Sequence, residues 1–417
     1  MSANYLVWII CALATAGVIL RPFNRPEAIW AVAGAAALVL CGLLPWREAL
    51  QGAGNGLDVY FFLTGMMLLA ELARREGLFD WLAGLAVAMA RGSPTRLFVL
   101  VYVVGALVTV FLSNDATAVV LTPAVAAAAR AAGVAPLPYL YICAFIANAA
   151  SFVLPISNPA NIVVFGARMP GLGDWLLQFT LPSIAAIGAT FAALYLTQRS
   201  ALAGHAMASA PPRMRLGAGG RLAGAGIGAI AIVLLVCSAL DLQLGLPTFI
   251  CGAVTTVLVL AIERKSPMPL LGGISWSVLP LVAGLFVLVE ALQRTGLVAA
   301  LARALQELLA SYPTGGVWGI GALIAAACNF VNNLPAGLIA GSITGTDHLP
   351  ANAVAAMLVG VDLGPNLSVT GSLATILWLV ALRRAGLDVT AVRFLKLGLL
   401  VTPPALALSL AALMFTK

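Results

Sequence analysis

Four short polar stretches interrupt an otherwise apolar chain, and they hold the side chains that could bind a solute. The candidate binding residues are Ser113, Asn114, Thr117, Asn148, Ser157, Asn158, Asn161, Asn332, Asn333, Gly364, Asn366, Thr370 and Ser372. Amide and hydroxyl groups can both donate and accept hydrogen bonds, which suits a polyhydroxylated solute. Where a helix is interrupted, unpaired carbonyls can bind a cation and unpaired N–H groups an anion or a neutral oxygen ligand.

Two carboxyl groups accompany these residues, Asp115 in the first stretch and Asp362 in the fourth. An acid inside a membrane is costly unless it is paired or solvated, so a functional role is the default expectation. Proton coupling is a natural role, because a carboxyl group withdrawn from water holds its proton more tightly and can exchange it near neutral pH. The alternative is structural, since either acid could cap a half-helix by accepting from backbone N–H groups.

The composition places these polar residues in a membrane protein. Of the 417 residues, 62% are hydrophobic and 9% are charged, whereas soluble proteins carry roughly 25% charged residues. Apolar stretches recur from end to end, so we predict an all-α polytopic membrane protein with one domain integrated in the lipid bilayer. The net charge of +7 bears on membrane topology and does not indicate nucleic-acid binding.

Ten apolar segments are predicted to span the bilayer, namely 4–20, 28–45, 57–74, 136–166, 174–197, 223–240, 246–262, 277–293, 351–382 and 394–415. The segments 136–166 and 351–382 are too long for ordinary spans and carry Pro, Gly, Ser and Asn in the middle, which predicts broken helices. In 97–131 and 317–345, two apolar arms flank a polar tip. Each arm is shorter than the roughly 20 residues that a span requires, which predicts two re-entrant hairpins.

The two halves of the chain repeat with an offset of 219 residues. Identical residues recur at this offset in the pairs Gly65 and Gly284, Glu71 and Glu290, Arg75 and Arg294, Gly77 and Gly296, Phe111 and Phe330, and Asn114 and Asn333. Each glutamate precedes its arginine by four residues, the spacing of a helical ion pair. With five spans each, the second copy is inverted relative to the first, and inverted repeats with broken elements are typical of secondary transporters.

The repeat and the charges together predict the organisation of the chain. We expect a first repeat over 1–197, a cytoplasmic linker over 198–222 and a second repeat over 223–417. With the amino terminus outside and helices 78–92 and 297–311 lying on the membrane surface, few basic residues remain outside. Only five of the 22 do, namely Arg47, Arg168, Arg294, Arg303 and Lys417. This distribution satisfies the positive-inside rule.

The sequence contains no motif for the commonest catalytic chemistries. A Gly-Lys-Ser/Thr phosphate loop and an HExxH motif are absent, so ATP hydrolysis by this chain is not expected and no enzyme activity, cofactor or metal site is predicted. The six cysteines lie scattered through apolar segments without CxxC spacing, which is typical of small buried side chains.

The polar stretches resemble the arsenical pump membrane protein family of the ion transporter superfamily. The resemblance is carried by Phe111-Leu-Ser-Asn-Asp115, by Ser157-Asn-Pro-Ala-Asn161, by Val331-Asn-Asn-Leu-Pro335 and by Asp362-Leu-Gly-Pro365 with Gly371-Ser372. It implies a scaffold and a mobile transport domain whose hairpin tips and broken helices bind the substrate. It also implies site roles for the matching residues Asn114, Asp115, Ser157, Asn158, Asn161, Asn332, Asn333 and Asp362. At the positions of Asn148 and Asn366 the family usually has an acid and a lysine. This difference leaves open how transport is coupled to an ion.

The resemblance implies export of trivalent arsenic or antimony hydroxide from the cytoplasm, through the cell (inner) membrane, in exchange for protons. Two other readings remain open. One is a sodium–proton antiporter that uses Asp115, Asp362 and freed carbonyls. The other is a membrane subunit driven by a separate soluble ATPase, which would dock on the basic 198–222 loop. An anionic dicarboxylate carrier is disfavoured, because the converging motifs contain no Arg or Lys.

Overall fold

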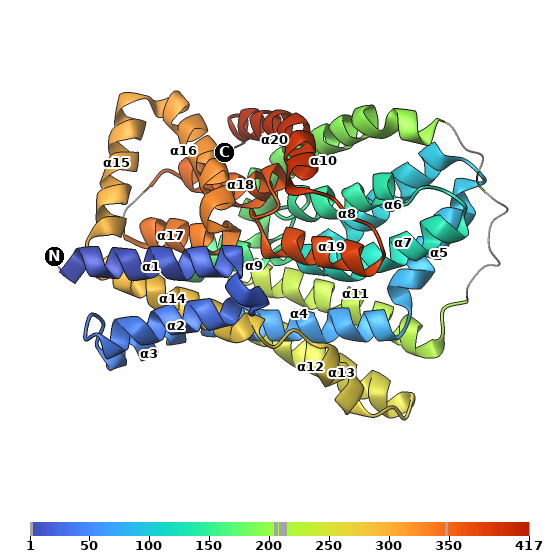
Figure 1. The fold of residues 1–417 in the computed structure, drawn as a ribbon, viewed down its shortest axis with the longest axis horizontal. Coiled ribbons are helices and arrows are strands. Elements are labelled where there is room, and N and C mark those ends of the chain that lie inside the picture. Colours follow the sequence, from blue (N-terminus) through green and yellow to red (C-terminus); the bar gives the residue numbers. More distant parts are fainter. Residues whose placement is uncertain (1–2, 204–206, 208–214, 347–348, 417) are drawn as a thin grey trace.

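The computed structural model describes residues 3–203, 207, 215–346 and 349–416, and within them the chain is helical without a β-strand. The helices of the first half are α1 (Ala3–Leu20), α2 (Glu27–Leu40), α3 (Trp46–Gly54), α4 (Leu57–Arg75), α5 (Leu78–Ala90), α6 (Pro94–Phe111), the π-helix η2 (Ala116–Leu121), α7 (Thr122–Ala131), α8 (Leu137–Ala149), α9 (Pro159–Phe165) and α10 (Leu172–Leu202). Most of them run along the long axis of the molecule (Figure 1).

The second half repeats the same order of elements. Its helices are α11 (Ala218–Ala239), α12 (Gly245–Ile262), α13 (Pro267–Gly273), α14 (Val278–Arg294), α15 (Leu297–Ser311), α16 (Pro313–Val331), α17 (Asn333–Thr346), α18 (Ala351–Leu363), the 3-10 turn η5 (Gly364–Leu367), α19 (Leu373–Arg384) and α20 (Ala391–Leu413). Three pairs of helices, α5 and α15, α6 and α16, and α10 and α20, begin 219 residues apart. The helix boundaries therefore follow the offset found in the sequence.

Helices of one half pack on helices of the other. In the scaffold, α2 packs on α14 and α4 packs on α12, while in the centre α9 packs on α17 and α7 on α19. A Cβ atom at Gly65 of α4 would lie 2.4 Å from the carbonyl oxygen of Thr248 in α12. One at its repeat counterpart Gly284 would lie 2.7 Å from the carbonyl carbon of Ala31 in α2. Glycine is needed at both crossings, because any side chain would force the two backbones apart.

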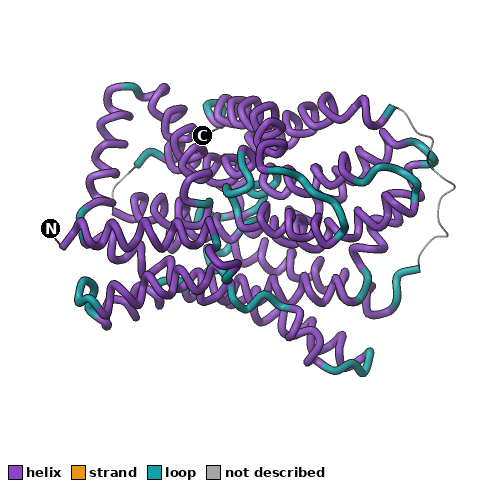
Figure 2. Tube along the Cα trace, in the orientation of Figure 1, coloured by secondary structure: helices purple, strands orange, loops and turns teal. Residues whose placement is uncertain are grey.

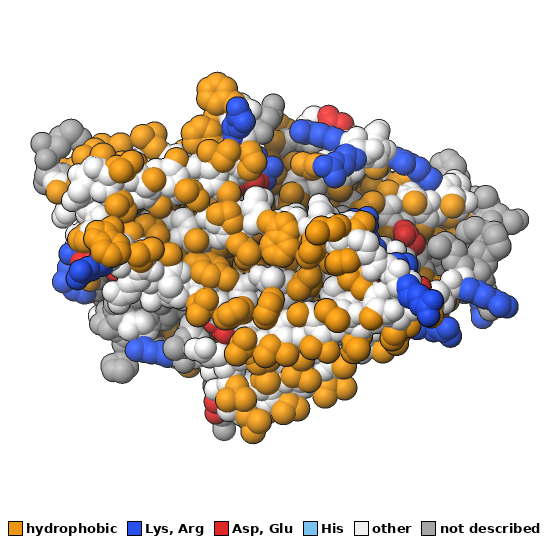
Figure 3. All heavy atoms as spheres, turned by 90° about the horizontal axis from the view of Figure 1, so that it is seen from below, with side chains coloured by type: hydrophobic (Ala, Val, Ile, Leu, Met, Phe, Trp, Pro, Cys, Tyr) orange, Lys and Arg blue, Asp and Glu red, His pale blue; other side chains and the backbone are white. Residues whose placement is uncertain are grey.

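The inversion of the repeat is visible in the short helices. α5 and α15 are repeat counterparts, yet they lie at opposite ends of the long axis, and α15 runs across that axis (Figure 1). Gly77 and Gly296 begin these helices with φ angles of 73° and 78°, a left-handed conformation that glycine adopts without strain. Hydrophobic side chains cover the middle of the face in Figure 3, and Lys and Arg lie toward its ends and along its upper edge. The protein is therefore a multi-pass membrane protein.

The lengths of the helices correct part of the sequence prediction. Seven described helices are long and apolar enough to span a bilayer, or up to nine if two bent pairs each count as one span. They include α6 and α16, the first arms of the two predicted hairpins, so those arms are longer than expected. Both helices begin with a proline at the first helical turn, which starts them upstream of the predicted limits. α2 is shorter than its predicted span.

One of the two predicted ion pairs is wrong. Glu71 pairs with Arg75 as expected, at 2.6 Å, and also with Arg74. Arg294 instead pairs with Glu48 of α3, because α3 packs on α14. The predicted linker is shortened by helix at both ends, since α10 continues to Leu202 and α11 begins at Ala218. Residues 204–206 and 208–214 of that linker lie outside the described residues.

Loops lie in the centre of the molecule as well as at its two ends (Figure 2). The central loops include those of the broken helices, α8–α9 and α18–α19, which the sequence predicts over 136–166 and 351–382. Protein surrounds both, since every residue of α8 from Pro138 onward is buried, as is the second half of α18. Irregular backbone at this depth is tolerated only where protein or a wet cavity encloses it.

Candidate functional site

The first break is closed by the side chain of Asn161. Its Nδ2 donates to the carbonyl oxygens of Ser151, Leu154 and Pro155 at 2.9, 3.2 and 3.2 Å. α9 restarts at Pro159 because Asn158 caps it, with Oδ1 accepting from the amide of Ala160 at 3.0 Å. The loop between α8 and α9 is therefore held in one shape by two asparagines.

The second break follows the same plan with different residues. Pro365 lacks an N–H group and disfavours helix in the residue before it, which ends α18. α19 restarts where the Ser372 hydroxyl accepts from the amide of Thr375 at 3.1 Å. Within the break, Gly364 lies so close to α16 that a Cβ atom would lie 2.5 Å from the Ala325 backbone. Only glycine fits there.

Two hydrogen bonds join the breaks to each other. Asn158 Nδ2 donates to Asp362 Oδ1 at 2.7 Å, and Asn148 Nδ2 donates to Asn366 Oδ1 at 2.9 Å. Asn366 in turn donates to the carbonyl of Phe145 at 2.9 Å. All four side chains of these two bonds are at most 2% exposed. The two positions at which the sequence departs from the family pattern are thus direct partners, and a neutral amide pair stands where an acid and a base are usual.

The second hairpin tip is bonded tightly to the second break. α16 ends at Val331, and the next residue, Asn332, turns the chain into α17 with a φ of 73°. Asn332 Nδ2 donates to the carbonyl of Thr370 at 3.2 Å, and the Asn333 amide donates to the carbonyl of Gly371 at 2.8 Å. One turn earlier, Asn329 accepts from the Ser368 hydroxyl at 2.7 Å and donates to the carbonyl of Gly364 at 3.0 Å.

The first hairpin tip forms its hydrogen bonds mostly within itself. Ser113 accepts from the Ala116 amide at 3.2 Å, and Asn114 from the Asp115 amide at 2.9 Å. Thr117 shares a hydrogen bond with Thr109 at 2.8 Å, between the two arms of the hairpin. The Asp115 carboxylate is half-buried and has no hydrogen bond to any described residue.

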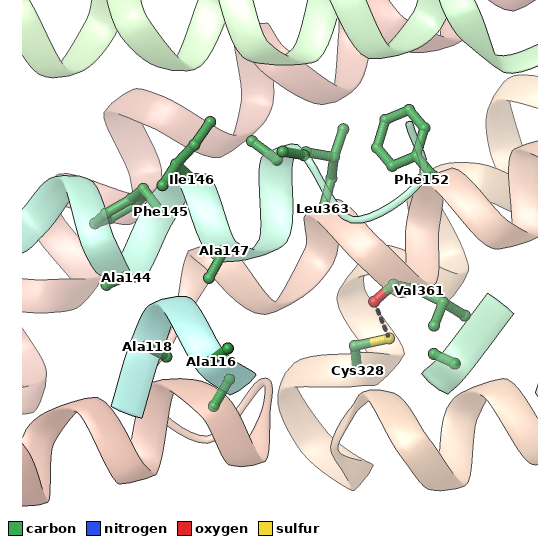
Figure 4. Close-up of a cluster of buried hydrophobic side chains, with 14 of the residues drawn as sticks. Ala116, Ala118, Ala144, Phe145, Ile146, Ala147, Phe152, Cys328, Val361 and Leu363 are labelled. Atoms are coloured by element: carbon green, nitrogen blue, oxygen red, sulfur yellow. Dashed lines mark hydrogen bonds between the residues drawn. The ribbon is translucent and has the colours of Figure 1, made fainter. Parts of the chain in front are cut away.

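A π-helix follows Asp115, and Pro123 explains it. Proline cannot donate a hydrogen bond, and its ring clashes with the carbonyl four residues earlier, so the preceding turn widens. Ala116 and Ala118 of this segment face Ala144 and Ala147 of α8 (Figure 4). Ser157 in the first break donates to the carbonyl of Val110 in α6 at 3.0 Å. Small residues thus let the first hairpin approach the first broken helix closely.

The charge balance of this region is simple. Among the described residues, Glu71 and Asp362 are the only acidic residues that are buried as a whole, and no Lys or Arg is. Glu71 is neutralised by two arginines at the end of α4. Asp362 is therefore the one fully buried acid at the breaks, surrounded by amide and hydroxyl groups.

The structure brings most of the predicted site residues into one region around the two breaks. Asn148, Asn158, Asp362 and Asn366 touch directly across them, and Asn332 and Asn333 contact the segment before Ser372. It does not bring Asp115 or Thr117 into hydrogen-bonding contact with the breaks. Asn329 belongs to the same region and is missing from the predicted set. Its position one helical turn before Asn332 is the signal that could have found it.

Comparisons with known proteins agree with this architecture. Residues 5–361 match the profile of the citrate transporter family. Arsenical pump membrane proteins of Yersinia enterocolitica and Escherichia coli are each 30% identical to the chain, and each alignment covers 84% of both proteins. The crystal structure of the Alcanivorax borkumensis YdaH transporter superposes with a TM-score of 0.58, at 16% identity, and covers 99% of this chain and 98% of that one.

The fold has two hairpins and two broken helices, and the matching family and relatives make the chain a multi-pass membrane transporter. The chain belongs to the arsenical pump membrane protein family and matches the broader citrate transporter family.

Proposed function

We propose that this protein is a secondary active transporter that exports arsenite and antimonite, as neutral hydroxides, from the cytoplasm in exchange for protons. The observation that carries the proposal is the hydrogen-bonded network across the breaks, in which Asn158 holds Asp362 among amide groups. Such a site can bind a neutral polyhydroxylated solute weakly enough to release it. The substrate class itself comes from the relatives, which are arsenical pump proteins.

Proton exchange is assigned to Asp362, because one of its oxygens is already bonded and the other is free. Oδ1 accepts from Asn158, while Oδ2 has no partner among the described residues. Oδ2 can either carry a proton or accept a hydrogen bond from the substrate. Binding of the proton therefore displaces the substrate, and binding of the substrate displaces the proton. The Cys328 thiol of α16 lies beside Asp362, since it donates to the carbonyls of Gly360 and Val361 at 3.9 Å. Asp115, half-buried and unpartnered, is the second coupling candidate.

The repeat also supports alternating access and a membrane orientation. We propose that the central broken helices and hairpins move against the α2–α14 and α4–α12 scaffold. The amino terminus lies outside and the central loop lies in the cytoplasm, since Arg199, Arg215, Arg221, Arg264 and Lys265 flank the loop-side ends of α10, α11 and α12. We assign the protein to the cell (inner) membrane, as the resemblance to the arsenical pump membrane proteins implies.

Transport of citrate is less well supported, although the citrate transporter profile matches. A multiply charged anion taken out of water needs cationic partners. The breaks offer none, because no Lys or Arg is buried in the described part of the chain. The amide network favours a neutral solute.

The test is uptake of arsenite into everted membrane vesicles with an imposed pH gradient. Wild type should take up arsenite and dissipate the gradient, whereas Asp362→Asn should lose gradient-driven uptake and Asp115→Asn should show whether the first tip takes part. Glu307→Gln, an exposed acid on α15, is the matched control and should transport as wild type does. Gradient dissipation by Na⁺ but not by arsenite would replace the proposal with a sodium–proton antiporter. Uptake that needs ATP and a soluble ATPase, but no gradient, would identify a pump subunit.

A further inference from the structure

Three buried acceptor oxygens at the two breaks lack a protein donor within the described residues. They are Asn148 Oδ1, Asn161 Oδ1 and Asp362 Oδ2, and their side chains are 1%, 0% and 0% exposed. The orientation of the amides is fixed by their neighbours. The nitrogen of Asn161 has three carbonyl partners, and the oxygen of Asn366 must face the nitrogen of Asn148 because its own nitrogen donates to Phe145.

The three oxygens lie in the two breaks, which two hydrogen bonds hold together. Asn158 donates to Asp362, and Asn148 donates to Asn366. Asn161 follows Asn158 by three residues on α9, and its nitrogen is bonded to carbonyls of the first break. One acceptor oxygen thus stays unused on each of Asn161, Asp362 and Asn148.

Such a cluster differs from the other unpartnered oxygens of the described chain. Most of those are hydroxyl groups on helices, namely on Ser183, Thr190, Ser238, Thr256 and Thr402, and a hydroxyl can rotate to donate to a nearby backbone carbonyl. An amide oxygen has no proton to redirect, and neither has the Asp362 oxygen once it has released its proton. Leaving one buried without a donor is costly, so three at the two breaks favour a solute that brings its own donors.

We propose that these three oxygens recognise their substrate by its hydroxyl groups, and that the protein selects a neutral solute that presents three O–H donors. This inference rests on the proposed function and sharpens it. Trihydroxides of arsenic and antimony have three donors, one for each oxygen. A methyl group in place of a hydroxyl would leave one buried oxygen without a donor, and a carboxylate ligand would place acceptor against acceptor.

The experiment compares three trivalent arsenicals in everted vesicles that contain the full-length protein. Arsenous acid has three hydroxyl groups, methylarsonous acid two and dimethylarsinous acid one. Each hydroxyl removed should raise KM by about tenfold, because one buried acceptor then stays unpaired in the complex. Equal KM values for the three compounds would overturn the proposal, since other groups or water would then satisfy these oxygens.

A double variant tests whether the oxygen of Asn148 binds one of the substrate hydroxyl groups. Asn148→Leu combined with Asn366→Leu removes one unpartnered acceptor together with its amide partner, so neither amide is left without the other, although the Phe145 carbonyl loses its Asn366 donor. This double variant should lose the roughly tenfold preference for arsenous acid over methylarsonous acid. Thr256→Val removes an unpartnered oxygen far from the breaks, on scaffold helix α12, and should keep the preference. An unchanged preference in the double variant would remove Asn148 from the proposal.

The wild-type series decides the main point even if the double variant does not reach the membrane. If the proposed function itself is wrong, the result will be different, because none of the three arsenicals would then be taken up under any gradient.

Discussion

Asn158→Ala should be among the most destabilising single substitutions at the breaks, because Asn158 makes two different contacts. Its oxygen caps α9 by accepting from the Ala160 amide, and its nitrogen donates to the buried carboxyl of Asp362 at 2.7 Å. Loss of a helix cap costs about 1 kcal/mol, and loss of a hydrogen bond to a charged, buried group costs about 1.5–3 kcal/mol. The substitution should therefore lower the free energy of unfolding by about 2.5–4 kcal/mol.

The repeat provides a matched control for this substitution. Ser372 caps α19 as Asn158 caps α9 and also shares a hydrogen bond with the Thr375 hydroxyl, but it has no carboxyl partner among the described residues. Ser372→Ala should therefore cost only about 1 kcal/mol. The free energies can be measured by titrating SDS into detergent-solubilised protein and following the fluorescence of the eight tryptophans.

A double-mutant cycle separates the two contacts of Asn158. Asp362→Asn keeps an oxygen that can accept from Asn158 but removes the charge. In that background, Asn158→Ala should cost about 1–1.5 kcal/mol less than in wild type, since the bond to a neutral group is weaker. The same cost in both backgrounds would refute the reasoning, because Asn158 would then act only as a helix cap.

Two further predictions follow from the packing of the breaks and of the first hairpin. Gly364→Ala should destabilise the protein by about 1–3 kcal/mol or prevent its assembly, because the added Cβ would lie 2.5 Å from the Ala325 backbone. The control is Gly188→Ala in α10, where the added Cβ meets open space. This control should leave the SDS midpoint unchanged or higher. Thr117→Val should lower the SDS midpoint but change the KM for arsenite less than twofold, because the Thr117 hydroxyl bonds to Thr109 between the hairpin arms. A large rise in KM would place Thr117 in the binding site after all.

Much of the architecture could be predicted from the sequence because the determining signals are local. Proline and glycine within long apolar stretches mark the breaks, and the offset that aligns Gly65 with Gly284 also aligns the beginnings of α5 and α15. Helix ends were harder to place. Pro94 and Pro313 start the first arms earlier than hydrophobicity alone suggests, so those arms are as long as spans.

The partners within the site could not be predicted, because they lie more than 200 residues apart in the chain. Nothing local indicates that Asn148 meets Asn366 or that Asn158 meets Asp362. The error at Arg294 has the same origin, since helical spacing favours Glu290 as its partner but the packing of α3 on α14 supplies Glu48. Likewise, the repeat aligns the two hairpin tips at Asn114 and Asn333, but it does not show that the second is bonded to a break and the first mostly to itself.

The exchange of packing partners between the halves has a consequence for how the protein is made. α2 and α4 leave the ribosome long before α14 and α12, on which they pack, so the close approach at Gly65 and Gly284 cannot form while only the first half has been synthesised. The early helices must therefore stay in the bilayer without their final packing partners, which is possible because each helix forms its own backbone hydrogen bonds. Assembly is therefore expected to finish late, and two separately expressed halves that are inserted together should be able to complete one another.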